Sequence, residues 1–218
     1  IISIFLINFY LIKPDLFGNQ LFSLIGILAF TFLSLFSISV INFINFMDGI
    51  DGLLVSTMSV LITFSILINK NFDLLPILGS LIVFIWWNWR PAKVFMGDSG
   101  STFLGAVLVG IIFSSNSLLN VLKILVASFP LLGDAGITVI RRFFNNENIF
   151  KAHKKQLFQR LVSGGLKQEG VTIIYLLSTL SLCIIGYLFN IYFQILILFI
   201  IFILGIYFEK FKAIKFSS

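Results

Sequence analysis

The sequence predicts an all-α membrane protein, a polytopic transmembrane bundle of about seven or eight helices. Of its 218 residues, 59% are hydrophobic and only 11% are charged, and the mean hydropathy is +1.08. A soluble domain of this size carries about 25% charged residues. Long uninterrupted apolar runs favour helices, because a lipid-facing barrel would alternate between apolar and polar residues.

Apolar runs mark the expected helices, and polar residues mark the turns between them. The runs cover residues 1–12, 20–44, 53–69, 74–89, 102–115, 118–140, 171–189 and 191–208. The first run is too short for a crossing, which takes about 20 residues. Because the chain begins at Ile1 without a signal-peptide pattern, we expect one integral-membrane domain over 1–218 that is truncated at its amino-terminal end.

Each boundary between runs has its own signal. An acidic stretch follows the run 20–44, three tryptophans end the run 74–89 where headgroups favour indole rings, and a Gly/Ser-rich turn precedes the run 102–115. The run 118–140 ends at an Arg pair, and a single Asn190 separates the last two runs. These signals divide the chain into helices that alternate in direction.

The basic residues predict the orientation in the membrane. If the runs alternate, all but three of the fifteen Lys and Arg residues lie on one side, the exceptions being Lys13, Lys70 and Lys123. The positive-inside rule makes the basic side cytoplasmic. The net charge of +6 therefore reflects topology and attraction to membrane lipids, and we expect no nucleic-acid partner. The single Cys183 excludes an intrachain disulfide.

Asp48 and Asp51 place two carboxylates in the break NFMDGIDG, which starts at Asn45. An ionisable residue at mid-membrane costs roughly 3 kcal/mol or more, so such residues near lipid are functional candidates. If a helix starts here, the three-residue spacing puts both on one face. Mg²⁺ binds through one or two carboxylates together with substrate phosphates. The alternative is that these residues cap the next helix.

Asp98 adds a third carboxylate in the break NWRPAKVFMGDSGS, which starts at Asn88. A Gly/Ser-rich turn at a helix start exposes backbone N–H groups to phosphate, and an adjacent Asp suits a metal ion. Capping is again the alternative. The string GDSG also surrounds the nucleophile of chymotrypsin-like proteases, but the sole His153 lies in a basic loop and a membrane helix offers no such scaffold.

The loop over residues 141–170 is the most basic part of the chain. Its cations suit a diphosphate or an anionic lipid surface, and we predict His153, Lys154 and Arg160 as its substrate contacts. Asp134 lies about two helical turns before this loop. A buried carboxylate needs a partner, so Asp134 is either protonated or orders the basic loop, and the sequence leaves both open.

The chain resembles the polyprenyl-phosphate N-acetylhexosamine-1-phosphate transferase superfamily, glycosyltransferase family 4. The resemblance rests on NFINFMDGIDGL, on NWRPAKVFMGDSGSTFLG and on PLLGD followed by RR and the NIFKAHKKQLFQRL loop. It implies a helical protein of ten or eleven spans in the bacterial inner membrane with a cytoplasmic active site. It also implies transfer of N-acetylhexosamine 1-phosphate from a UDP-sugar to undecaprenyl phosphate, with release of UMP and a requirement for Mg²⁺ or Mn²⁺.

The resemblance also implies roles for individual residues. Asp98 is expected to bind the metal together with Asp48, and Asp51 and His153 complete the catalytic set. Asn45 would line the nucleotide site, and two further residues would contact the uracil and nucleoside. Those two residues are Asn88 and Phe95. A homodimer is left open.

Two departures from the family pattern bear on these expectations. The family carries an Asp-Asp pair on an earlier loop, and the chain has no such pair, so we expect it to precede Ile1. Here one His is followed by KKQ, which is similar to the branch that initiates O-antigen or capsule synthesis rather than to the muramoyl-pentapeptide enzymes. Two alternatives are a truncated noncatalytic homologue and a transporter or channel, although a transporter favours midplane charges and internal repeats.

Overall fold

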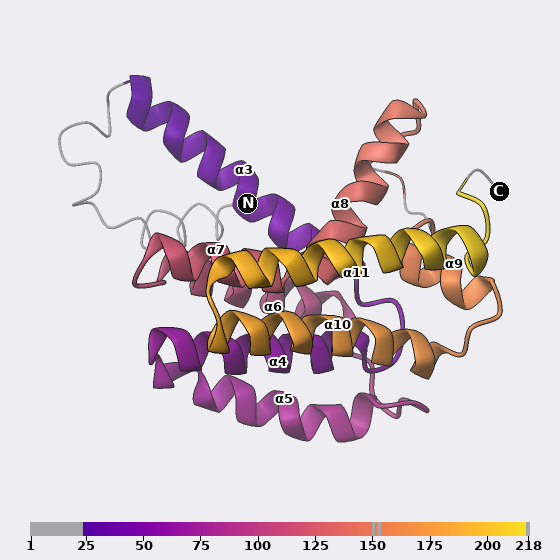
Figure 1. The fold of residues 1–218 in the computed structure, drawn as a ribbon, viewed down its shortest axis with the longest axis horizontal. Helices are drawn as coiled ribbons and strands as arrows, with labels where there is room; N and C mark the ends of the chain where they lie inside the picture. Colours follow the sequence, from indigo (N-terminus) through magenta and orange to yellow (C-terminus); the bar gives the residue numbers. More distant parts are fainter. Residues whose placement is uncertain (1–23, 150, 152–153, 217–218) are drawn as a thin grey trace.

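The computed structural model describes residues 24–149, 151 and 154–216 (Figure 1). All regular secondary structure in these residues is helical. The expected run 1–12 and His153 lie outside these residues. The helices are α3 (Leu24–Phe46), α4 (Leu53–Asn69), α5 (Leu75–Asn88), α6 (Gly97–Phe113), α7 (Leu118–Ala127), α8 (Phe129–Phe144), α9 (Leu157–Ser163), α10 (Gln168–Leu188) and α11 (Ile191–Phe211), with a short 3-10 helix, η2 (Phe72–Leu74), before α5. The predicted fold class is therefore confirmed.

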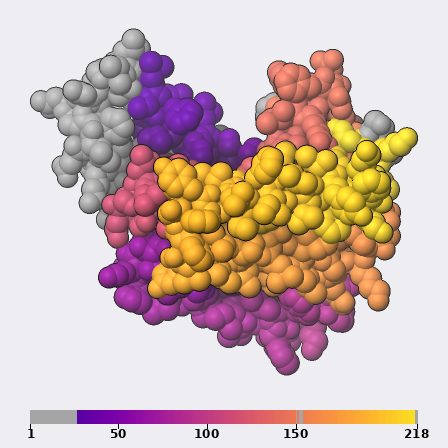
Figure 2. All heavy atoms as spheres, viewed as in Figure 1, coloured from indigo at the N-terminus to yellow at the C-terminus, as the bar shows by residue number. Residues whose placement is uncertain are grey.

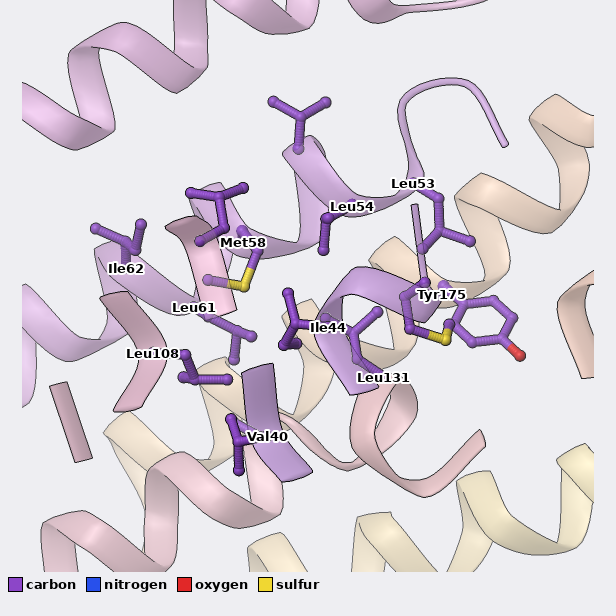
Figure 3. Close-up of a cluster of buried hydrophobic side chains, with 14 of the residues drawn as sticks. Val40, Ile44, Leu53, Leu54, Met58, Leu61, Ile62, Leu108, Leu131 and Tyr175 are labelled. Carbon is purple, nitrogen blue, oxygen red and sulfur yellow. The ribbon is translucent and has the colours of Figure 1, made fainter. Parts of the chain in front are cut away.

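Helix α4 forms the centre of the bundle, and most of its side chains are buried. Its small hydroxyl residues donate hydrogen bonds back to carbonyls one turn earlier, as Ser56 does to Gly52 and Thr57 does to Leu53. These bonds satisfy the hydroxyls inside the helix, so neighbouring helices can pack closely against it. Apolar side chains from α3, α4, α6, α8 and α10 meet in one core (Figure 3).

Helices α3 and α6 approach each other closely at a glycine. A Cβ atom added to Gly105 would lie 2.8 Å from the Cα of Ile41, which is shorter than real Cβ contacts. Only glycine therefore allows this approach of the two backbones. The contact fixes the spacing of α3, which Asp48 follows, and α6, which carries Asp98 in its first turn.

The apolar run 118–140 forms two helices in place of one continuous helix, because the chain bends by 70° between α7 and α8. Pro130 lies in the first turn of α8, where its missing N–H and its ring prevent the helix from continuing straight through. As a result, α8 points away from the stacked helices. Helix α3 also points away from the stack, and a notch separates α3 from α8 above α11 (Figure 2). The short α9, within the basic loop, was not expected from the sequence either.

The helix lengths fit a protein that crosses the membrane several times. Among the described helices, α3, α10 and α11 are long and apolar enough for a crossing, and the bent pair α7 and α8 would make a fourth. Three shorter apolar segments accompany them. The chain is therefore a multi-pass membrane protein, and the candidate functional residues lie in turns at one end of its bundle.

Candidate active site

The turn between α3 and α4 places Asp48 and Asp51 outside both helices. Helix α4 begins only at Leu53, so the two carboxylates do not share a helix face as the spacing suggested. The residue before α4 is Gly52, at φ +75°, and it makes no side-chain cap. Neither aspartate therefore caps α4, and the capping alternative is wrong for both.

Asp51 is tied to two other parts of the bundle. Its carboxylate accepts the backbone N–H of Ala92 at 3.2 Å, and the Arg90 guanidinium lies 4.0 Å from the same oxygen. Its backbone carbonyl accepts the hydroxyl of Thr172, at the start of α10, at 2.9 Å. The turn is thus fixed against the α5–α6 loop and α10.

Asn88, at the end of α5, is buried, and both the oxygen and the nitrogen of its side-chain amide form hydrogen bonds. Its oxygen accepts the N–H of Gly52 at 3.1 Å, and its nitrogen donates to the carbonyl of Val94 at 2.9 Å. These bonds connect the α3–α4 turn to the segment before Phe95. The Phe95 ring itself is 75% exposed and free to stack on a planar ligand. The predicted nucleoside contacts of Asn88 and Phe95 stay predictions.

Asn45, in the last turn of α3, bonds to the start of α6. Its side-chain oxygen accepts the hydroxyl of Ser101, which is buried in the first turns of α6. Helix α6 begins at Gly97, at φ +68°, several residues earlier than the apolar run suggested. Asp98 therefore lies in the first helical turn, exposed, and does not cap the helix.

Asp48 and Asp98 lie near enough to each other for their charges to interact. The pKa of Asp48 is raised from its ordinary value of 3.8 to about 6, first because burial disfavours the charged form and second because Asp98 repels it. Two repelling carboxylates, one half-buried and one exposed, are a favourable place for a cation. Asp51, in contrast, has Arg90 nearby.

The donor set fits Mg²⁺ or Mn²⁺ only if other ligands complete it. Within the part of the chain that the structure describes, no three His, Cys, Asp or Glu side chains gather closely enough to hold a metal ion by themselves. Mg²⁺ commonly uses one or two carboxylates and completes its shell with water and substrate phosphates. Asp48 and Asp98 meet that requirement, and the metal site that they would form stays a prediction.

The end of the basic loop lies against the turn between α3 and α4, where a Cβ atom added to Gly49 would lie 2.7 Å from the Phe158 ring. Its Lys154 is exposed, whereas Arg160 is buried and occupied: the guanidinium donates to the carbonyls of Lys155 and Ile214, both at 3.1 Å, and to Glu209 at 2.6 Å. Arg160 thus holds the loop and the carboxyl-terminal segment together. Its predicted substrate contact, like that of Lys154, stays a prediction.

Residues that the sequence reasoning did not assign to the site also hold these turns in place. Thr172 and Gln168 start α10, where Gln168 accepts a hydrogen bond from Arg90. Their only signal in the sequence is their place just after the basic loop. Asp134, whose role the sequence leaves open, accepts two backbone N–H groups at the start of α9 and so orders the end of the basic loop.

An apolar pocket of about 320 Å³ opens among α8, α10 and α11. Its walls include Ile137, Ile174 and Phe202, and its lining also includes Arg141 and Arg160. Both arginines are paired with Glu209, which also lines the pocket, so the rest of the lining is mostly apolar and suits a hydrocarbon chain.

Comparison with known proteins identifies the family. Residues 1–116, just over half of the chain, match the model of glycosyl transferase family 4. A probable undecaprenyl-phosphate N-acetylglucosaminyl 1-phosphate transferase of Bacillus subtilis is 33% identical over 147 residues, which are 62% of this chain and 39% of that protein. A phospho-N-acetylmuramoyl-pentapeptide-transferase of Corynebacterium diphtheriae is 29% identical over 109 residues, 50% of this chain and 29% of that protein.

The same kind of enzyme from Streptomyces coelicolor is 51% identical over 41 residues, 19% of this chain and 11% of that protein. The chain thus spans less than half the length of each of these relatives. Its matching region contains both acidic motifs, whose carboxylates Asp48 and Asp98 the fold brings together. The chain belongs to glycosyl transferase family 4.

Proposed function

We propose that the full-length protein transfers N-acetylhexosamine 1-phosphate from a UDP-sugar to undecaprenyl phosphate and releases UMP. The reaction would take place at the cytoplasmic face of the bacterial plasma membrane, in the first membrane step of a cell-surface polysaccharide. The observation that supports the proposal is the nearness of Asp48 and Asp98, from two separate motifs that hydrogen bonds from Ser101 to Asn45 and from Gly52 to Asn88 hold together. The relatives' names support the reaction class.

The described residues have distinct tasks in this reaction. Asp48 and Asp98 would hold Mg²⁺, which when bound would neutralise phosphate charge. Phe95 offers its exposed face to the uracil, and Lys154 adds positive charge for the diphosphate. The acceptor phosphate is already anionic, so positioning and charge neutralisation matter more than a strong base.

The polyprenyl tail of the acceptor needs an apolar surface within reach of these groups. The pocket among α8, α10 and α11 offers apolar walls for such a tail, while the Arg141 and Arg160 guanidiniums in its lining are already paired with Glu209. Family membership favours a transferase over the transporter alternative. The donor sugar is the finer part of the proposal: the KKQ sequence after His153 favours an N-acetylhexosamine over a muramoyl pentapeptide.

The test is UMP release by the purified full-length protein with Mg²⁺, undecaprenyl phosphate and a panel of UDP-sugars. We expect turnover with a UDP-N-acetylhexosamine and little with UDP-muramoyl pentapeptide. Asp98→Asn should lower the rate at least about a hundredfold. Asp73→Asn is the matched control, because Asp73 is exposed in η2 at the opposite end of the bundle.

Two results would contradict the proposal. If UMP release persisted in EDTA and in the Asp98→Asn protein, the metal assignment would be wrong. If no donor in the panel yielded UMP, the noncatalytic alternative would replace the enzyme.

A further inference from the structure

Arg142, in the last turn of α8, is almost completely buried, with its side chain only 4% exposed. Its guanidinium reaches forward into the loop that follows. It donates to the carbonyls of Ile149 at 3.3 Å, Lys151 at 3.1 Å and Asn148 at 2.5 Å, and its Nε lies 3.2 Å from the Glu147 carboxylate. One side chain therefore bonds to four positions of the segment after its own helix.

These bonds leave Arg142 little capacity for a ligand. A guanidinium has five N–H donors in a fixed plane, and the four bonds use four of them. A buried guanidinium that lost these partners would be left with unpaired charge, which is strongly unfavourable. The arrangement is thus one in which the loop folds around the arginine.

Asp134 holds the other end of the same loop from two turns earlier on α8, a rise of roughly 12 Å. Its two carboxylate oxygens accept the backbone N–H groups of Leu157 at 2.7 Å and Phe158 at 3.2 Å, which begin α9. The hydroxyl of Tyr175, on α10, donates to the same carboxylate at 2.7 Å. Asp134 therefore fixes where α9 begins relative to α8 and α10.

The two ends of the loop are also joined to each other. Lys155, next to α9, donates to Glu147 at 3.0 Å, and Glu147 also contacts Arg142. Arg160 donates to the carbonyl of Lys155 at 3.1 Å. The connection between α8 and α9 is consequently held at its start, at its end and across its base.

We propose that Arg142 and Asp134 are positioning residues, through which α8 holds the described parts of the basic segment before α9, residues 145–149, 151 and 154–156. The exposed lysines of that segment, Lys151 and Lys154, are thereby presented to substrate from a fixed frame. The importance of this frame for catalysis rests on the proposed function. The hydrogen-bonded arrangement itself does not depend on the proposed function.

The experiment combines limited trypsin digestion with kinetics on the full-length protein in detergent. Arg142→Lys keeps the charge but cannot reach three carbonyls and a carboxylate at once. We expect cleavage after Lys151 and Lys154 to become about tenfold faster or more, while cleavage after Lys167, exposed before α10, is unchanged. The donor KM should rise and kcat/KM should fall about tenfold.

Asp134→Asn is the second variant, because it loosens only the α9 end. It should speed cleavage after Lys154 and Lys155 more than after Lys151, and Asp73→Asn is its matched control. Wild-type cleavage rates in both variants would overturn the proposal, and so would an equal rise at Lys167, which would indicate general loosening. If the wild-type protein released no UMP, the proposed function would fail while the cleavage pattern still decided the positioning role.

Discussion

Asn88 accepts a hydrogen bond from the backbone of Gly52 at 3.1 Å and so connects the end of α5 to the turn that carries Asp48 and Asp51. The same amide donates to Val94, directly before Phe95. The two acidic motifs, far apart in the sequence, are thus joined through one buried side chain. The geometry of the candidate site depends on backbone bonds as well as on its acidic residues.

Replacing Asn88 should affect stability and activity together. Asn88→Ala leaves the N–H of Gly52 and the carbonyl of Val94 without their partners, so we expect a loss of about 2 kcal/mol in the free energy of unfolding. The donor KM should rise at least about tenfold. Asn71→Ala, which removes only a local bond at the opposite end, should leave the kinetics unchanged. Wild-type kinetics in Asn88→Ala would show that the two hydrogen bonds of Asn88 are dispensable for the reaction.

Gly52 should not tolerate a side chain. Its φ of +75° disfavours other residues, and an added Cβ would lie 3.0 Å from the Trp89 ring. We expect Gly52→Ala to lower stability by about 1–2 kcal/mol. Gly79→Ala, on an exposed part of α5 with no atom near the added Cβ, should be neutral or stabilising by up to about 1 kcal/mol. Thermal unfolding in detergent compares the two, and equal midpoints would contradict the strain argument.

Helix α6 offers a matched pair of glycines that tests the spacing of Asp48 and Asp98. Gly105→Ala would push α6 away from the backbone of Ile41, whereas a Cβ at Gly110 meets nothing. We expect Gly105→Ala to lower the rate of UMP release about tenfold or more and to weaken its dependence on Mg²⁺ concentration, because a 1 Å misplacement costs about a hundredfold. Gly110→Ala should behave as wild type. If both behaved alike, the contact with α3 would not set the site.

The raised pKa of Asp48 predicts an unusual pH dependence of stability. Between its ordinary value of 3.8 and about 6, the folded protein holds a proton that the unfolded chain has lost, so stability falls as pH rises through this range. Asp48→Asn should therefore be more stable than wild type at pH 7.5 in EDTA, by about 1 kcal/mol after allowance for solvent screening. The difference should vanish below about pH 4.

Mg²⁺ provides the complementary measurement. At pH 7.5 it should raise the thermal midpoint of the wild-type protein and have little effect on Asp48→Asn, since the variant lacks one of the two carboxylates. Tryptophan fluorescence during heating measures the thermal midpoints of the two proteins, with Mg²⁺ and with EDTA. A variant that is less stable than wild type in EDTA would refute the assigned cause of the pKa shift.

The sequence was sufficient to predict the fold class and the common side of the acidic motifs, because hydropathy and charge report the membrane directly. It did not reveal the bend before α8, since Pro130 sits inside an apolar run that reads as one span. It could not show that Arg160 is buried while Lys154 is exposed, because both are cations in a basic loop and only tertiary packing distinguishes them. The role of Arg142 was equally hidden, because three of its four partners are backbone carbonyls, which any residue type supplies.

Helix α10 touches the candidate site at one end and a second polar cluster at the other. Thr172 bonds to the carbonyl of Asp51, while near the far end Gly186 accepts from Lys123, and Gln194 of α11 donates to Lys123 and Leu182 carbonyls. Because these hydrogen bonds hold α10 near both of its ends, they oppose tilting and sliding of the helix within the bundle. We therefore expect any adjustment that accompanies a catalytic cycle to occur in connecting segments while the transmembrane scaffold stays still.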